Sequence, residues 1–136
     1  MPIVFLSLDE VLALQADQIS RYGGRPGLRS FELLQSAIAL PAATFAGVFL
    51  HDGFPEMAAA YLFHIVRNHP FVDGNKRTGL MAMLAFLGLN GLRLDADPDA
   101  VVRLVTGVAD GHTSKSEIAV FVKTHVRPRR ARRRGR

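Results

Sequence analysis

The sequence contains no cysteine and no tryptophan. Without cysteine, the chain can form neither a disulfide framework nor a site in which a thiolate serves as nucleophile or metal ligand. The phosphate-binding pattern Gly-x-x-x-x-Gly-Lys-Ser/Thr and the zinc-hydrolase pattern His-Glu-x-x-His are also absent. These absences exclude thiol enzymes, nucleoside triphosphatases of the P-loop class and zinc hydrolases that carry their ligands on one helix.

Long apolar runs are absent as well. Stretches such as residues 79–89 fall short of the ~18 apolar residues that indicate a membrane-spanning helix. Asp9 and Glu10 occupy the region where a signal peptide would have its apolar core. We therefore expect a cytoplasmic protein.

The positive charge of the chain is concentrated at its C-terminus. The formal net charge is +5, and seven arginines lie in residues 127–136, so subtracting them leaves −2 for the rest of the chain. We expect residues 1–126 to form one domain with its own core and residues 127–136 to form a disordered basic tail. Such a tail could bind nucleic acid weakly or have no role, and we favour the second interpretation.

Caps and apolar spacing predict two helices in the N-terminal part of the chain. The first begins with a capping box, Ser7 to Glu10, and the second follows the cap residue Ser30 and stops at Pro41. Residues 42–53 mix apolar side chains with glycines and predict an irregular segment or a short hairpin.

The rest of the chain predicts four more helices. Two strongly apolar ones, over 55–68 and about 75–90, are expected to lie at the centre of the fold. Further helices are expected to open at Pro98 and after Ser114. The pattern therefore predicts an all-α bundle of about six helices with an apolar helix–loop–helix in its middle.

The most polar short stretch of the chain lies between these two apolar helices. It reads His69-Pro-Phe-Val-Asp-Gly-Asn-Lys-Arg-Thr78 and combines an imidazole, a carboxylate, an amide and two cations. Gly74 permits a left-handed backbone, and Asn75 can cap the next helix. The first amides of that helix, beside Lys76 and Arg77, would carry partial positive charge and suit a phosphate group.

The remaining groups of this stretch suit phosphoryl chemistry. The imidazole of His69 is a group that can take a proton from an attacking hydroxyl. Asp73 can hold a Mg²⁺ ion that also binds phosphate oxygens, and Arg77 can stabilise charge on a transferred phosphoryl group. Each residue alone could instead be a cap, a turn or a solvated charge. Their convergence between two buried helices favours a site.

Residues 69–77 resemble the Fic-domain signature, His-Pro-Phe-x-(Asp/Glu)-Gly-Asn-Gly-Arg-x-x-Arg. They resemble even more the variant of the Doc (death-on-curing) toxins, His-x-Phe-x-Asp-Ala-Asn-Lys-Arg-Thr. The segment Ile19-Ser-Arg-Tyr-Gly-Gly24 is also similar to the N-terminal region of Doc. The resemblance implies a single-domain Fic/Doc-like helical bundle with its active site in the central helix–loop–helix.

Two departures from the Fic signature indicate the subclass. Position 76 is Lys where most Fic proteins have Gly, and position 80 is Leu where they have a second Arg. A lysine at 76 should obstruct the seat that Fic enzymes use for the phosphates of ATP when they transfer AMP. Both features are those of Doc toxins, whereas Gly74 replaces the usual Ala of Doc.

The resemblance to Doc implies a toxin of a type II toxin–antitoxin system that acts as a protein kinase. Such a toxin passes the γ-phosphate of ATP to a threonine of elongation factor Tu and blocks translation. AMP transfer to a protein hydroxyl and a catalytically silent binding module remain the alternatives.

The resemblance also implies the site residues, with ATP as co-substrate and Mg²⁺ as cofactor. His69 would be the general base and Asp73 the metal ligand. Nucleotide and phosphate groups would be bound by Gly74, Asn75, Lys76 and Arg77. We further expect Phe71 to anchor the loop on the core, His64 to be a core histidine, and His51, His112 and His125 to lie at the surface.

The implied partner is a Phd-like (prevents-host-death) antitoxin that folds on binding. Residues 42–53 contain more apolar side chains than a surface connection needs, which is typical of a binding surface. The alternative is that Phe45, Val48 and Phe49 close the core beneath the first helices.

Overall fold

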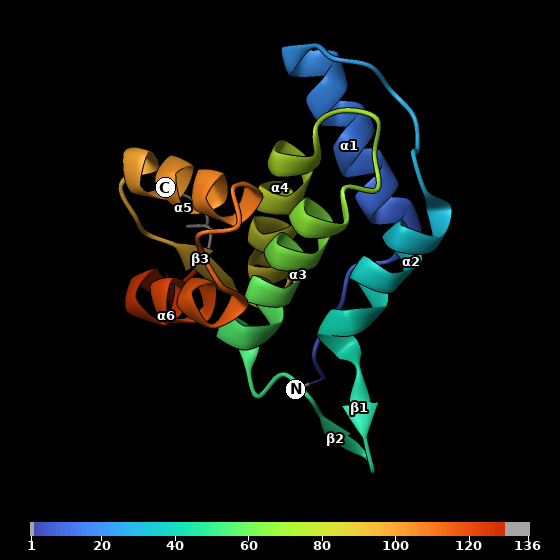
Figure 1. The fold of residues 1–136 in the computed structure, drawn as a ribbon. Coiled ribbons are helices and arrows are strands. Elements are labelled where there is room, and N and C mark those ends of the chain that lie inside the picture. Colours follow the sequence, from blue (N-terminus) through green and yellow to red (C-terminus); the bar gives the residue numbers. More distant parts are fainter. Residues whose placement is uncertain (1, 130–136) are drawn as a thin grey trace, which may run out of the picture.

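Two helices, α3 (Phe54–Asn68) and α4 (Asn75–Leu89), form the centre of the fold (Figure 1). The computed structural model describes residues 2–129 of the chain. α3 is buried along most of its length, as its nearly continuous apolar sequence predicts. Gly79 permits its close approach to α4, since a Cβ at that position would lie 2.8 Å from Val66 Cγ2.

The other helices cover the central pair. They are α1 (Leu8–Tyr22), α2 (Phe31–Ala39), α5 (Pro98–Ala109) and α6 (Lys115–His125). α1 packs on α4 and α2 on α3, while α5 and α6 lie on the opposite side of the pair (Figure 1). The expected all-α bundle of about six helices is confirmed within the described residues. None of these helices has the length and apolar character that a membrane crossing requires.

The predicted caps are present. Ser7 Oγ accepts from the Glu10 N–H at 3.1 Å while Glu10 Oε1 accepts from the Ser7 N–H at 2.8 Å, and a second capping box links Ser114 to Glu117. α2 follows Ser30 and gives way to a 3₁₀ turn, η1 (Leu40–Ala42), that contains Pro41. These ends are set by local hydrogen bonds, which is why the sequence predicts them.

Residues 42–53 contain the short hairpin that was one of the two expectations for this segment. β1 (Thr44–Phe45) pairs antiparallel with β2 (Val48–Phe49), and the hairpin projects from the helical body (Figure 1). Phe45 is 76% exposed and Val48 68% exposed, so these two side chains do not close the core. Phe49 contacts Phe5, with ring centroids 5.8 Å apart.

A second strand pair corrects the expected start of the tail. β3 (Leu92–Leu94) pairs antiparallel with β4 (Val126–Pro128), and the Arg129 N–H donates to Gly91 O at 2.8 Å. Residues 127–129, expected in the tail because of their charge, therefore belong to the fold. Amino-acid composition does not indicate their backbone pairing with β3. The other residues of the expected tail, 130–136, lie outside the described residues.

Candidate active site

The loop between α3 and α4 is shaped by two left-handed residues. α3 ends at Asn68, and His69 follows with φ 52° and ψ 53° while its N–H donates to Ile65 O at 3.2 Å. This conformation is uncommon for residues with a Cβ, although histidine adopts it more readily than most, and it is enriched at functional sites. Gly74, the residue before α4, has φ 78°, as its glycine character predicts.

The six residues predicted from sequence line one cavity of about 450 Å³. They are His69, Asp73, Gly74, Asn75, Lys76 and Arg77, and Val66, Val72 and Ala109 complete the wall. His69 is exposed, and its imidazole makes no hydrogen bond to any residue in the described part of the chain. The ring is therefore free to accept a proton from a bound molecule.

Asn75 does not cap α4, contrary to the expectation from sequence. Gly74 is the N-cap, and Asn75, the first helical residue, turns its side chain back onto the loop. Asn75 Oδ1 accepts from the Phe71 N–H and Asn75 Nδ2 donates to Phe71 O, both at 3.0 Å. Phe71 is 1% exposed, which confirms its predicted anchoring role. The side-chain amide of Asn75 thus closes the loop by joining residue 75 to the backbone of residue 71.

The start of α4 consequently has no side-chain cap. The first N–H groups of a helix have no intrahelical acceptor, and they carry the positive end of the helix dipole. At α4 these groups belong to residues 75–77, which line the cavity. Backbone geometry and the neighbouring Lys76 and Arg77 therefore make this end of the cavity a place for an anion.

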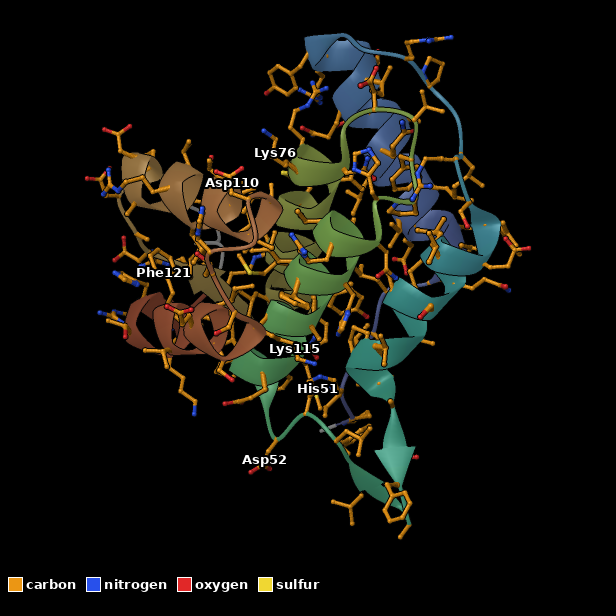
Figure 2. The ribbon with its side chains drawn as sticks, viewed as in Figure 1. His51, Asp52, Lys76, Asp110, Lys115 and Phe121 are labelled. Carbon is orange, nitrogen blue, oxygen red and sulfur yellow. The ribbon has the colours of Figure 1, made fainter. Side chains whose placement is uncertain are left out.

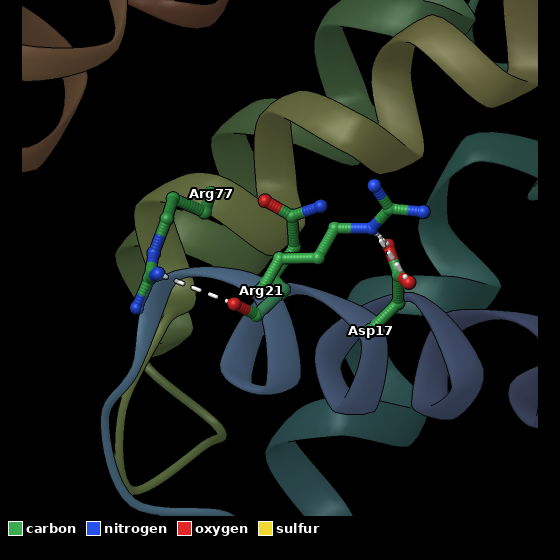
Figure 3. Close-up of polar contacts among 4 residues, drawn as sticks. Asp17, Arg21 and Arg77 are labelled. Atoms are coloured by element: carbon green, nitrogen blue, oxygen red, sulfur yellow. Dashed lines mark hydrogen bonds and ion pairs between the residues drawn. The ribbon is translucent and has the colours of Figure 1, made fainter.

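Arg77 contacts the end of α1 (Figure 3). Its guanidinium donates to Gly23 O at 3.0 Å and to Gln18 O at 3.3 Å. Among residues 2–129, no carboxylate forms an ion pair with Lys76 or Arg77; the nearby Asp17 pairs with Arg21 instead. Carbonyl contacts leave the charge of Arg77 uncompensated, so both cations can act on a phosphate group.

Asp73 offers a single carboxylate. Its Oδ2 accepts from the Arg25 N–H at 2.9 Å, and its backbone O accepts from Gln15 Nε2 at 3.3 Å. Among the described residues, no group of three or more His, Cys, Asp or Glu side chains could hold a metal ion without other ligands. One carboxylate suits Mg²⁺ that also takes water and phosphate oxygens as ligands. The chemistry of Asp73 therefore fits a metal that binds together with a nucleotide.

Sequence reasoning missed the contribution of α1 to this loop. Gln15 and Gln18 are only 5% and 6% exposed, although both are polar. The available signal was their spacing of three on the apolar stripe of the first helix, where a polar residue is unusual unless it makes a buried contact. Gln15 makes such a contact with the Asp73 backbone.

The histidines outside the loop include one correction. His51, expected at the surface, is only 9% exposed, and Lys115 Nζ lies 3.1 Å from its Nε2. His51 and Lys115 lie close together and away from Lys76 (Figure 2). The same Nζ lies 3.3 Å from His64 Nε2. Burial lowers the pKa of His64 to about 4, with smaller electrostatic contributions from Lys115 and His51.

Comparison with known proteins identifies the family. A model of the Fic/DOC family matches residues 5–87, which is more than half of the chain and includes the loop with all six site residues. The chain belongs to the Fic/Doc family. Its membership confirms the resemblance noted from residues 69–77 and agrees with the helical fold.

Two relatives connect this Fic/Doc protein to Doc. The chain is 44% identical over 92 residues to a protein named Toxin Doc from Mycolicibacterium smegmatis (strain ATCC 700084 / mc(2)155), covering 68% of this chain and 70% of that protein. It is 38% identical over 114 residues to a protein named Protein kinase doc from Escherichia phage P1, covering 84% of this chain and 89% of the relative.

Proposed function

We propose that this Fic/Doc protein is the toxin of a type II toxin–antitoxin system and acts as a protein kinase. In this proposal it transfers the γ-phosphate of ATP to a threonine of elongation factor Tu and so blocks translation. The names of the two relatives support the toxin and kinase classes. The observation that carries the proposal is the convergence of His69, Asp73 and the uncapped start of α4 on one cavity.

The proposed reaction uses the free imidazole and the cationic end of the cavity. His69 takes the proton of the target hydroxyl while that oxygen attacks the γ-phosphorus of ATP and the bond from that phosphorus to the β,γ-bridging oxygen breaks, releasing ADP. The amides at the start of α4 and the side chain of Arg77 bind phosphate oxygens. Asp73 would hold Mg²⁺, which neutralises charge on the phosphates when bound.

Lys76 supports phosphoryl transfer over nucleotidyl transfer. The residue is exposed on the first turn of α4 and lines the cavity. A side chain at this position occupies space that a glycine would leave to the phosphates. We infer that the nucleotide therefore presents its γ-phosphate to His69. Asn75 acts in this proposal by shaping the loop through Phe71, in addition to its expected contact with the nucleotide.

Isotope position in ATP tests the reaction. The purified protein is incubated with Mg²⁺, elongation factor Tu and ATP labelled either at the γ- or at the α-phosphate. We expect label in the factor only from γ-labelled ATP, on a threonine identified by peptide mass. Label from α-labelled ATP would show AMP transfer instead. Label from neither, with growth arrest still produced in cells, would favour the binding module.

His69→Ala is the matched control for this assay. Removal of one general base lowers a rate by ~10²–10⁴-fold. Because His69 is an exposed loop residue, the thermal stability of the variant should change little. Growth arrest by a folded His69→Ala protein at equal expression would contradict the proposed role of this residue.

We also propose that a Phd-like antitoxin docks on the β1–β2 hairpin. The hairpin exposes Phe45, Val48 and Leu50, which together form an apolar patch that projects from the body. Such patches usually mark binding surfaces. Hydrogen exchange with and without the antitoxin tests this placement. Protection is expected over residues 42–53, and protection confined to remote residues would show that the antitoxin binds elsewhere.

A further inference from the structure

The segment between α1 and α2 holds the loop of the candidate active site. The Val72 N–H donates to Gly27 O at 3.0 Å, and the N–H groups of Arg29 and Ser30 donate to Pro70 O at 2.7 and 3.0 Å. These bonds join residues 40 to 45 positions apart in the sequence. The backbone of the loop is therefore supported from outside the motif as well as by Asn75.

Arg29 adds a side-chain contact at the end of α3. Its Nε donates to His69 O at 2.7 Å and its Nη2 donates to Asn68 O at 2.9 Å. These carbonyls lie at the C-terminal end of the helix, where acceptors lack intrahelical donors and the dipole is negative. The rigid guanidinium can bind both acceptors at once and so fixes their relative orientation, which a lysine ammonium cannot do as well.

The imidazole of His69 depends on this backbone for its position. No described residue hydrogen-bonds to the ring, and the left-handed conformation of residue 69 sets the direction in which its Cα–Cβ bond leaves the backbone. The N–H of that residue is held by Ile65 O, and its carbonyl is held by Arg29. Removing the guanidinium would free one end of a residue whose conformation is intrinsically unfavourable.

We propose that Arg29 is a positioning residue that sets the orientation of the His69 imidazole. The inference rests on the proposed function, in which His69 is the general base. Arg29 itself touches no reacting group. Because a displacement of about 1 Å in a catalytic group can cost ~10²-fold in rate, loss of this contact should act mainly on the chemical step.

The variants Arg29→Gln and Arg29→Lys test the proposal, with Arg21→Gln as the control. Arg21 is likewise exposed, but its side chain pairs with Asp17 and not with the carbonyl of His69. We expect Arg29→Gln to lower kcat by about 10- to 100-fold with the KM for ATP nearly unchanged. Arg29→Lys, which keeps the charge without the planar fork, should fall between the wild type and Arg29→Gln.

A second readout does not depend on phosphoryl transfer. The Cε1–Hε1 NMR signal of His69, assigned by its loss in His69→Ala, should shift in Arg29→Gln but not in Arg21→Gln. An unchanged His69 signal in Arg29→Gln would overturn the proposal, whether or not the protein phosphorylates any substrate. A shifted signal with unchanged kcat, or a raised KM with unchanged kcat, would overturn the catalytic consequence. An active wild type is not needed for the NMR result, so failure of the proposed function is recognised separately.

Discussion

Lys115 Nζ lies 3.3 Å from Nε2 of His64 and links the first turn of α6 to the central helix α3. A lysine ammonium has donors only, so the Nε2 atom must accept and the imidazole is neutral. His51 accepts from the same ammonium at 3.1 Å, and burial together with the charge of Lys115 lowers its pKa as well. One cation therefore holds two uncharged rings.

This contact predicts that acid destabilises the fold. The pKa of His64 falls from 6.5 to about 4 in the folded state, chiefly through burial and then through Lys115. Between these values the unfolded state binds the proton and the folded state does not, so the free energy of unfolding should decrease as pH falls through that window. Above pH 6.5, protonation of His64 no longer lowers the free energy of unfolding.

Urea denaturation across this pH range measures the effect. His64→Gln should reduce the pH dependence and leave the part that comes from His51. Lys115→Met should reduce it only in part, because both histidines stay buried. His112→Gln, at an exposed position, is the control and should leave the dependence unchanged. A slope in His64→Gln as steep as that of the wild type would contradict the assignment.

Asn75 and Lys76 are adjacent but should respond differently to substitution. Asn75→Ala leaves the buried N–H and C=O of Phe71 without partners, which should cost about 1–3 kcal/mol of stability. Lys76→Met removes an exposed charge and should change stability by less than about 0.5 kcal/mol. Phosphoryl transfer should fall in both. Equal stabilities of the two variants in urea would show that Asn75 does not close the loop.

Two glycines of α4 provide a matched test of the central helix pair. At Gly79 a Cβ would meet Val66 Cγ2 at 2.8 Å and Leu62 O at 3.3 Å, so Gly79→Ala should destabilise by about 1–3 kcal/mol. At Gly88 the nearest atom would be Arg129 Nη1 at 4.0 Å. Gly88→Ala should therefore stabilise the helix by roughly 0.5–1 kcal/mol. Thermal denaturation distinguishes the two signs, and a neutral Gly79→Ala would argue against the close approach.

Two truncations test the contribution of β4. A chain ending at Val126 loses the pairing of Arg127 and Pro128 with β3 and both contacts of Arg129, with Gly91 O and Gly88 O. We expect a loss of about 1–3 kcal/mol from these hydrogen bonds. A chain ending at Arg129 keeps every contact that the structure describes and should match the full chain. Equal urea midpoints for both truncations would contradict this role.

The sequence predicted the features that depend on neighbours along the chain. Capping boxes at Ser7 and Ser114, the break at Pro41 and the left-handed Gly74 all follow from residues a few positions apart. The apolar character of residues 55–68 likewise predicted a buried central helix.

Features that depend on distant contacts were not predictable. His51 was expected at the surface because nothing nearby in sequence indicates its contact with Lys115, which is 64 positions away. Arg29 carried no motif, and its contact with His69 spans 40 positions. From its neighbours in sequence, Asn75 could equally have capped the helix. Its side chain instead hydrogen-bonds the buried backbone of Phe71.

The support of the loop from the α1–α2 region means that the motif is not a portable module. Contacts of Arg77 with Gln18 and Gly23, and of Arg29 with His69, cross 40 to 59 positions of the sequence. Closing such long loops costs conformational entropy, so these contacts form only with the tertiary fold. A helical hairpin cut out as residues 54–89 would carry all six site residues and still lack the geometry that makes them a site.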